Sequence, residues 1–190
     1  MCVEVSIGVS NRHVHLKKED LEILFGVGYE LEFYKPLKQP GQFASCDKVT
    51  IKTDKSEISN VRILGPVRNY TQVEISKTDA FKLGINPPVR TSGDLKGSAG
   101  ITIVGPKGVL KLNEGCIIAD RHIHITPNQV KEFGLDKEEV SVKIKGIKGG
   151  ILEQVHLKID ENSYFELHLD TDDANAHLIS DGDIVEIIRN

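Results

Sequence analysis

Asn-Arg-His-Val-His-Leu at positions 11–16 and Asp-Arg-His-Ile-His-Ile at positions 120–125 are near copies of one hexapeptide. Both copies follow β-branched residues, at 3–9 and 117–118, so each His-x-His pair is expected in a strand. Residues two apart in a strand point to the same face, about 6.5 Å apart along the chain. Both imidazoles of a pair can therefore converge on one ion. A single His-x-His is a weak signal, but two in the same setting predict metal binding rather than half-buried structural histidines.

The repeated hexapeptide also predicts an internal duplication, with a boundary between residues 115 and 120. No Ser/Pro-rich linker separates the halves, so they are expected to pack closely or to exchange strands. Short β-branched segments bounded by Gly, Pro and Asp favour barrels or sandwiches over a parallel βαβ sheet. These segments are 3–9, 48–53, 58–64, 71–75, 101–104, 108–112, 140–144, 151–159, 164–169 and 184–188.

Three short helices are expected between these strands, each ending at a glycine suited to the left-handed C-cap position. They span 18–25, 77–83 and 127–133, and the glycines are Gly26, Gly84 and Gly134. Ser76 and Thr126 are the expected N-caps of the second and third helices. A helix N-terminus next to a strand end favours bound anions through its free N–H groups and its dipole.

Glu74 stands in the same frame as His124, because each lies two residues before an expected N-cap. Glu74 therefore offers a carboxylate where His124 offers an imidazole, although spacing alone leaves an ordinary strand-end glutamate equally open. His168 precedes an acidic, helix-starting turn at 169–175 and repeats the strand-end placement. His156 is expected on the surface of a strand, and His177 on a helix with either role open.

Imidazoles with one carboxylate and no thiolate suit Zn²⁺, with Fe or Mn as alternatives. Four strand histidines exceed what one catalytic zinc with an open position requires, which indicates two ions. Cys2, Cys46 and Cys116 are widely spaced and form neither a disulfide framework nor a zinc knuckle. Covalent catalysis through Cys46 or Cys116 lacks support, since neither lies in a cationic helix-start setting.

Three arginines lie close to these motifs. Arg12 and Arg121 precede the histidine pairs and are expected to pair with carboxylates in the opposite half. Arg68 follows the turn at 65–67, six residues before Glu74, so its guanidinium is a candidate to hold an oxyanion at the metal's edge. A merely solvated turn arginine is the alternative. The sequence contains no Ser-His-Asp order, GxSxG, Walker loop or GxGxxG after a strand.

Composition excludes several classes of partner. The formal net charge of -4 gives no basic face for nucleic acid. No apolar run approaches the ~20 residues that span a bilayer, and the N-terminus lacks the features of a signal peptide. Tryptophan is absent, which argues against stacking platforms for bases. Free thiols without a disulfide framework favour a cytoplasmic protein.

Five segments in chain order resemble the PduL-type phosphotransacylases, or phosphate propanoyltransferases. They are Ser-Asn-Arg-His-Val-His-Leu at 10–16, Asn-Val-Arg-Ile-Leu-Gly-Pro-Val-Arg at 60–68, Gln-Val-Glu-Ile-Ser at 72–76, Asp-Arg-His-Ile-His at 120–124 and His-Leu-Asp-Thr-Asp-Asp-Ala-Asn at 168–175. The resemblance covers nearly the whole chain. It implies a mainly β fold of two small β-barrels capped by short helices, with residues 12–120 in one barrel and the first strand, 1–11, joining 121–190 in the other.

The resemblance also implies two zinc ions at the barrel interface. One would be held by His13, His15 and Glu74, and the other by His122, His124 and His168. The spacing reaches Glu74 by itself, whereas the choice of His168 over His177 rests on the resemblance. The implied reaction converts a short-chain acyl-CoA, acetyl or propanoyl, and phosphate into acyl phosphate and CoA, reversibly, by direct phosphate attack on a zinc-polarised thioester. Arg68 would hold the phosphate.

Several residues would contact coenzyme A. Carried over by position, they are Val9, Ser10, Asn11, Arg62 and Asn175, with Lys55 added for the CoA phosphates. A binuclear metallohydrolase of thioesters or phosphate esters and a non-enzymatic metal-binding scaffold are the alternatives. The oligomeric state is left open, including a homo-oligomer.

The N-terminus bears on location. Family members sorted into bacterial microcompartments carry an amphipathic extension before the first strand. Here that strand is expected to start at Val3, which favours the bacterial cytoplasm over a microcompartment lumen, unless a preceding segment has been removed.

Overall fold

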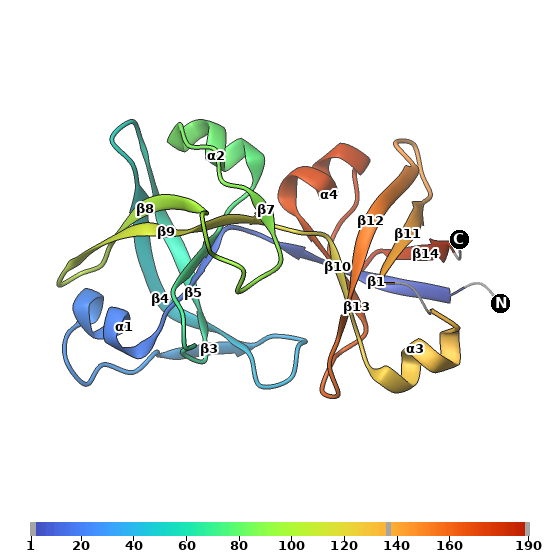
Figure 1. Cartoon of the computed structure of the whole chain (residues 1–190), viewed down its shortest axis with the longest axis horizontal. Helices are drawn as coiled ribbons and strands as arrows, with labels where there is room; N and C mark the ends of the chain where they lie inside the picture. The colour runs from blue at the N-terminus through green and yellow to red at the C-terminus, as the bar shows by residue number, and fades with distance from the viewer. Residues whose placement is uncertain (1–2, 136–137, 189–190) are drawn as a thin grey trace. The chain divides into compact units, whose positions relative to one another are not determined.

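The computed structural model describes residues 3–135 and 138–188, which are mainly strand with four short helices (Figure 1). Cys2, one of the three cysteines considered above, lies outside the described residues. The chain divides into two compact units. We name them the His13 unit, Arg12–Ala119, and the His122 unit, Met1–Asn11 with Asp120–Asn190.

Six strands close a barrel in the His13 unit. In order around the barrel they are β9 (Val109–Ala119), β6 (Gln72–Glu74), β2 (His13–His15), β5 (Glu57–Gly65), β4 (Phe43–Lys52) and β8 (Ala99–Val104), which returns to β9. Two short strands, β3 (Phe33–Pro36) and β7 (Val89–Arg90), pair with β4 and β9. The unit also holds helices α1 (Lys18–Phe25) and α2 (Lys77–Leu83).

The His122 unit contains a second closed barrel of six strands. Their order is β1 (Val3–Ser10), β13 (Glu166–Asp170), β10 (His122–Ile125), β12 (Gly150–Ile159), β11 (Glu139–Ile144) and β14 (Ile184–Ile188), which returns to β1. Its helices are α3 (Pro127–Phe133) and α4 (Thr171–His177), which lie on opposite sides of this barrel (Figure 1).

Both barrels have the same sequence of parallel and antiparallel neighbours. The strand that precedes each histidine pair joins the barrel of the other unit: β1 precedes β2 but pairs with β13 and β14, and β9 precedes β10 but pairs with β6 and β8. The predicted fold class, two small barrels with the first strand exchanged, is confirmed. The exchange of β9 is its reciprocal.

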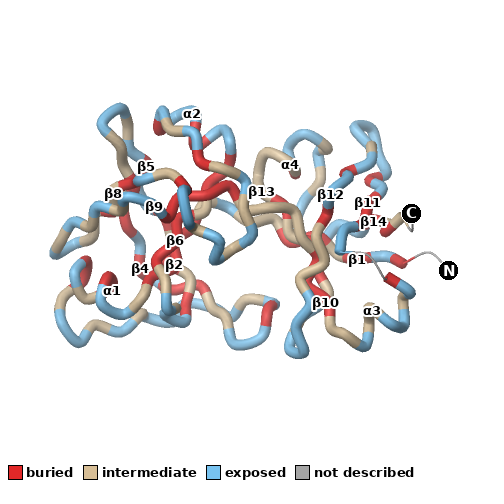
Figure 2. The backbone as a smooth tube through the Cα atoms, in the orientation of Figure 1, coloured by how far each residue is buried: buried red, intermediate tan, exposed pale blue. Residues whose placement is uncertain are grey.

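Side chains alternate in direction along β2 and β10, so one face of each strand lines the barrel core and the other carries the histidines. Val14 is fully buried in the core of its barrel, and Ile123 has the same place in the other. Their histidine neighbours therefore face the outside of each barrel. β2 is buried along its whole length, and β6 is buried except at Glu74, which is half-buried (Figure 2). Each core is almost entirely aliphatic, so the polar side chains of the unit gather on the opposite strand face.

All four helices begin in the same way, with an N-cap two residues after a histidine or glutamate of the preceding strand. The N-caps are Lys17, Ser76, Thr126 and Asp170, following His15, Glu74, His124 and His168. Ser76 and Thr126 cap through their side chains as predicted, and Thr126 forms a capping box with Gln129.

Two of the three predicted glycine C-caps are left-handed. Gly84 and Gly134 have φ of 67° and 62° with ψ of 33° and 42°. The prediction for Gly26 is wrong, since its φ of 108° and ψ of 155° lie outside the left-handed helical region. Gly26 N–H bonds to Glu22 O, and the chain then leaves in an extended direction towards Gly28, whose N–H bonds to the Glu22 side chain.

Several strands differ from the prediction. The short edge strands β3 and β7 were not predicted, and β9 is one strand where the sequence suggested two segments at 108–112 and 117–118. In the part of the chain that the structure describes, none of the helices is both long and apolar enough to cross a membrane.

Candidate metal centres

Strand register builds the first candidate centre. β2 runs antiparallel to β6, so that His13 lies opposite Glu74 and His15 lies opposite Gln72. His13, His15 and Glu74 present one donor atom each, all within 4.8 Å of one another. Glu74 Oε2 is 3.3 Å from His13 Nε2, and Glu74 Oε1 is 3.9 Å from His15 Nε2.

The same register builds a second candidate centre in the His122 unit. β10 runs antiparallel to β13, so that His122 lies opposite His168 and His124 lies opposite Glu166. Donor atoms of His122, His124 and His168 also lie within 4.8 Å of one another. The structural counterpart of His168 is therefore Glu74, whereas the sequence frame had matched Glu74 with His124.

Both groups fit a zinc ion in their donor chemistry and spacing. Zinc takes imidazole and carboxylate ligands at about 2.0–2.1 Å, and two such ligands of a tetrahedral ion are about 3.3 Å apart. The His13–Glu74 pair has this separation, and so have the Nε2 atoms of His122 and His124, at 3.3 Å. An imidazole must be neutral to bind a metal.

Burial keeps one histidine of each pair neutral. It is the main cause that lowers the pKa of His15 to about 2, and the neighbouring His13 and Arg68 add to it. Burial likewise lowers the pKa of His124 to about 2, with further contributions from His168 and His122. Both imidazoles therefore keep a free lone pair throughout the physiological pH range.

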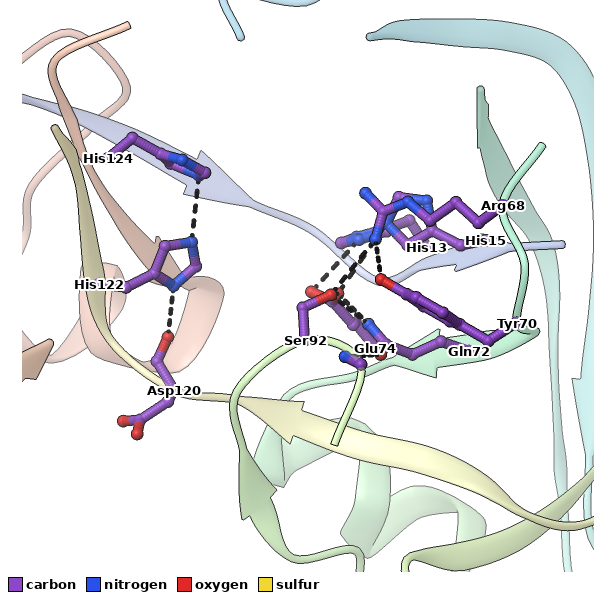
Figure 3. A network of polar contacts seen from close by, with 11 residues as sticks. His13, His15, Arg68, Tyr70, Gln72, Glu74, Ser92, Asp120, His122 and His124 are labelled. Atoms are coloured by element: carbon purple, nitrogen blue, oxygen red, sulfur yellow. Dashed lines mark hydrogen bonds and ion pairs between the residues drawn. The ribbon is translucent and has the colours of Figure 1, made fainter. Parts of the chain in front are cut away.

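A backbone carbonyl orients His122. Asp120 O lies 2.8 Å from His122 Nδ1, and since a carbonyl only accepts, Nδ1 carries the proton and Nε2 faces His124 (Figure 3). A hydrogen bond behind a ligand histidine fixes its tautomer in this way at metal sites. The Asp120 carboxylate meets His156 Nε2 at 2.8 Å, so His156, a half-exposed residue of β12, lies behind the centre rather than among the donors.

Arg68 lies beside the His13 centre. Its Nη1 donates to Tyr70 Oη at 2.7 Å and to Ser92 Oγ at 3.3 Å, and Ser92 Oγ is 3.3 Å from Glu74 Oε1 (Figure 3). Its backbone N–H donates to Leu16 O, which ties the loop to the end of the histidine strand. One hydroxyl therefore separates the guanidinium from a metal-donor carboxylate.

Gln72 completes this network. Its Nε2 donates to Ser92 Oγ at 2.8 Å and to Glu74 Oε1, while its Oε1 accepts from the Gly93 N–H at 2.7 Å. Gln72 thereby fixes Glu74 from behind and anchors the loop that carries Ser92. Sequence reasoning missed Tyr70, Gln72 and Ser92. The signal available for Gln72 was its place two residues before Glu74, on the same strand face.

Arg12 and Arg121, which were expected to pair with carboxylates in the opposite half, each have an acidic partner in their own unit. Arg12 Nε is 2.7 Å from Asp79 Oδ2, and Arg121 makes a bidentate pair with Asp173 at 2.8 and 2.9 Å. Each aspartate lies in the same unit as its arginine. Asp79 is the third residue of α2 and Asp173 is the third residue of α4, the helices that follow the strands of Glu74 and His168. The carboxylates raise both arginine pKa values.

The residues expected to contact coenzyme A fall into two sets. In the His122 unit, Val9 and Ser10 pair with the end of β13, and Asn175 lies in α4, which starts there. Asn11 follows β1 directly.

In the His13 unit, Arg62 pairs with His13 across β5 and β2, and its guanidinium lies 5.0 Å from the ring centre of Tyr34. Lys55 is not brought to this end of β5. Its side chain packs against Gly84 at the end of α2, and the strand from Glu57 to Arg62 alone is about 16 Å long.

Three further residues considered above lie outside both donor groups. His177 Nδ1 contacts Lys148 O at 2.8 Å. Cys116 is buried, which raises the pKa of its thiol to about 12, whereas Cys46 is exposed. Neither cysteine is in a donor group.

A family model described as phosphate propanoyltransferase matches residues 6–180. The chain belongs to this family. A phosphate propanoyltransferase of Thermotoga maritima is 53% identical over 97% of this chain and 89% of its own. Those of Rhodopseudomonas palustris and Lachnoclostridium phytofermentans are 46% and 50% identical, over 98% and 97% of this chain and 83% and 87% of theirs. Membership of the phosphate propanoyltransferase family makes the chain an acyltransferase.

Proposed function

We propose that the chain interconverts a short-chain acyl-CoA, acetyl- or propanoyl-CoA, plus phosphate with acyl phosphate plus CoA, using one zinc ion in each donor group. Proteins called phosphate propanoyltransferases with 42–53% identity support the substrates. The observation that carries the proposal is the position of Arg68, one hydroxyl away from the donor carboxylate Glu74. A metal centre with an arginine at its edge is suited to holding an anion next to an electrophile.

The His13 unit would bind the phosphate. The fixed, planar donors of Arg68 suit two phosphate oxygens at once, and its positive charge offsets the repulsion between phosphate and the acidic Glu74. Tyr70 and Ser92 hold the guanidinium from the side. Binding phosphate in one orientation converts its attack on the thioester into an effectively intramolecular step.

The reaction balances without a redox partner. A phosphate oxygen forms the bond to the carbonyl carbon, the carbon–sulfur bond breaks, and the electron pair leaves with the CoA sulfur. Zinc held by these donors would polarise the thioester carbonyl and favour the thiolate form of the leaving group. The lowered pKa of His15 and His124 prevents either imidazole from acting as a proton donor near neutral pH. Their part is to hold the ions.

CoA recognition is assigned to both units. Val9, Ser10, Asn11 and Asn175 are proposed contacts from the His122 unit, and Arg62 from the His13 unit. Arg62 is next to the donor strand and bonds to Ser45 O, which holds its guanidinium in place. Lys55 stays a prediction for a CoA phosphate. The bacterial cytoplasm and the oligomeric state also stay predictions.

A thiol-release assay tests the proposed activity. Propanoyl-CoA or acetyl-CoA is mixed with the zinc-loaded protein, with and without phosphate, and free CoA is followed with a thiol reagent. We expect release that depends on phosphate. Release of equal rate without phosphate would mean a thioester hydrolase, and no release from either acyl-CoA would favour a metal-binding scaffold.

A further inference from the structure

The two candidate centres differ in where their carboxylate lies. In the His13 unit, the residue opposite the first histidine is Glu74, and the residue opposite the second is Gln72. In the His122 unit, the same two positions are His168 and Glu166. The carboxylate is therefore at the donor position in the His13 unit, and two residues earlier along the strand in the His122 unit. The donors of the His13 centre are two histidines and one carboxylate, whereas those of the His122 centre are three histidines with a carboxylate beside them.

Glu166 contacts the third donor of its centre. Its Oε2 is 3.0 Å from His168 Nε2, just as the Gln72 amide bonds to Glu74 in the other unit. The Glu166 side chain is only 4% exposed. Burying a carboxylate is costly unless it is paired and hydrogen-bonded, so its place here is explained by a nearby positive charge or proton.

A glycine leaves the room for this pair. Gly8 lies opposite His168 in the β1–β13 register. A Cβ at Gly8 would be 2.7 Å from Glu166 Oε2 and 3.1 Å from His168 Cδ2. Since both distances are below normal van der Waals contact, any side chain here would displace the carboxylate or the imidazole.

We propose that Glu166 is a positioning residue of the His122 centre that supplies the negative charge Glu74 supplies as a donor in the His13 centre. This inference rests on the proposed metal centres. Among the described residues, the converging donors of this unit are three histidines, and Glu166 is not one of them. An ionised carboxylate only accepts, so it holds the proton on His168 Nε2 and leaves the lone pair of Nδ1 available to bind an ion. Such a carboxylate–histidine pair orients the ring and strengthens it as a ligand.

The test measures zinc affinity rather than turnover. Zinc is titrated against a chelating dye with the full chain, and the binding step that disappears in His124→Ala identifies the His122 centre. Glu166→Gln keeps the size of the side chain and removes its charge. Loss of a partner behind a ligand typically costs about 10- to 100-fold in metal affinity, so we expect that weakening in the His122 centre only. Glu153→Gln, an exposed carboxylate of the same unit, is the matched control and should change neither step.

Two further variants sharpen the test. The double variant Glu166→Gln/His168→Glu rebuilds the Gln72–Glu74 arrangement, and we expect it to bind zinc more tightly than Glu166→Gln alone. Gly8→Ala leaves Glu166 in the chain but pushes a methyl group against it, and should also weaken the His122 centre. Gly8→Ala gives the answer if Glu166→Gln does not fold, as judged by circular dichroism.

The outcomes separate the two levels of the proposal. Two zinc ions in the wild-type protein with unchanged affinity in Glu166→Gln or Gly8→Ala would overturn the role of Glu166. If the double variant binds zinc no more tightly than Glu166→Gln alone, Glu166 does not supply the negative charge that Glu74 supplies as a donor. A wild-type protein that binds no zinc would overturn the metal centres themselves and this inference with them.

Discussion

Replacing Arg68 with alanine removes the proposed phosphate-binding group while leaving the metal donors in place. The guanidinium donates to Tyr70 Oη and Ser92 Oγ, neither of which is a donor to the ion. Its backbone bond to Leu16 O is unaffected by the substitution. Loss of one charge-assisted donor at a transition state typically costs about 3 kcal/mol, or at least about a hundredfold in rate. We expect at least this loss in phosphate-dependent CoA release.

The zinc affinity of Arg68→Ala should be equal to that of the wild type or slightly higher. Arg68 is one of the causes that lower the pKa of His15, but burial is the larger cause and remains. His15 therefore stays neutral in Arg68→Ala, and the loss of a nearby positive charge removes repulsion towards a bound cation. Arg68→Lys keeps the charge without the planar pair of donors, so it should be slower than wild type but faster than alanine.

The assay compares initial rates of CoA release across phosphate concentrations, with zinc content measured on the same samples. Arg90→Ala is the matched control. Arg90 lies only two residues before Ser92, but its side chain contacts Val89 O and Asp94. Normal turnover and unchanged phosphate dependence in Arg68→Ala would refute the assignment. Loss of zinc in that variant would show that Arg68 supports the metal centre instead.

Three further predictions test the parts separately. His15→Ala and His124→Ala should each lose one of two zinc ions and all measurable turnover; elemental analysis that still finds both ions in either variant would contradict that donor set. A thiol reagent at pH 8 should label exposed Cys46 and spare Cys116, whose raised pKa of about 12 leaves almost no thiolate, and peptide mapping that finds the reverse would contradict the burial. Thr126→Ala should lower the free energy of unfolding by about 1 kcal/mol, because it removes the side-chain cap of α3; an unchanged urea midpoint would contradict the role of this cap.

The sequence was sufficient for features that depend on local periodicity. The His-x-His pairs predict their own strands, and the caps Ser76 and Thr126 mark the helix starts correctly. Glu74 could be singled out because a strand end, a cap and a helix follow one another at fixed spacing. The resemblance added His168 and the exchange of the first strand, which no local pattern predicts.

Features that depend on distant pairing were missed or wrong. Ser92 reaches Arg68 and Glu74 from a loop with no periodicity, and the pairing of β7 with β9 and the bonds to Gln72 bring that loop near. The sequence did not predict the aspartates that Arg12 and Arg121 bind in a helix of their own unit. The match of Glu74 with His124 rested only on their equal spacing from an N-cap in the sequence. Antiparallel register shows that its counterpart is His168, since both lie opposite the first histidine of a pair.

The source of the oxygens in the product tests the central claim, phosphate attack on a thioester, most directly. Propanoyl-CoA and phosphate labelled with ¹⁸O at all four oxygens are incubated with the zinc-loaded protein in ordinary water, and the products are analysed by mass spectrometry. Attack by phosphate predicts propanoyl phosphate that retains all four labelled oxygens, because the bridging oxygen comes from phosphate. Unlabelled propanoate formed without any labelled acyl phosphate would mean attack by water, and would contradict the proposed function.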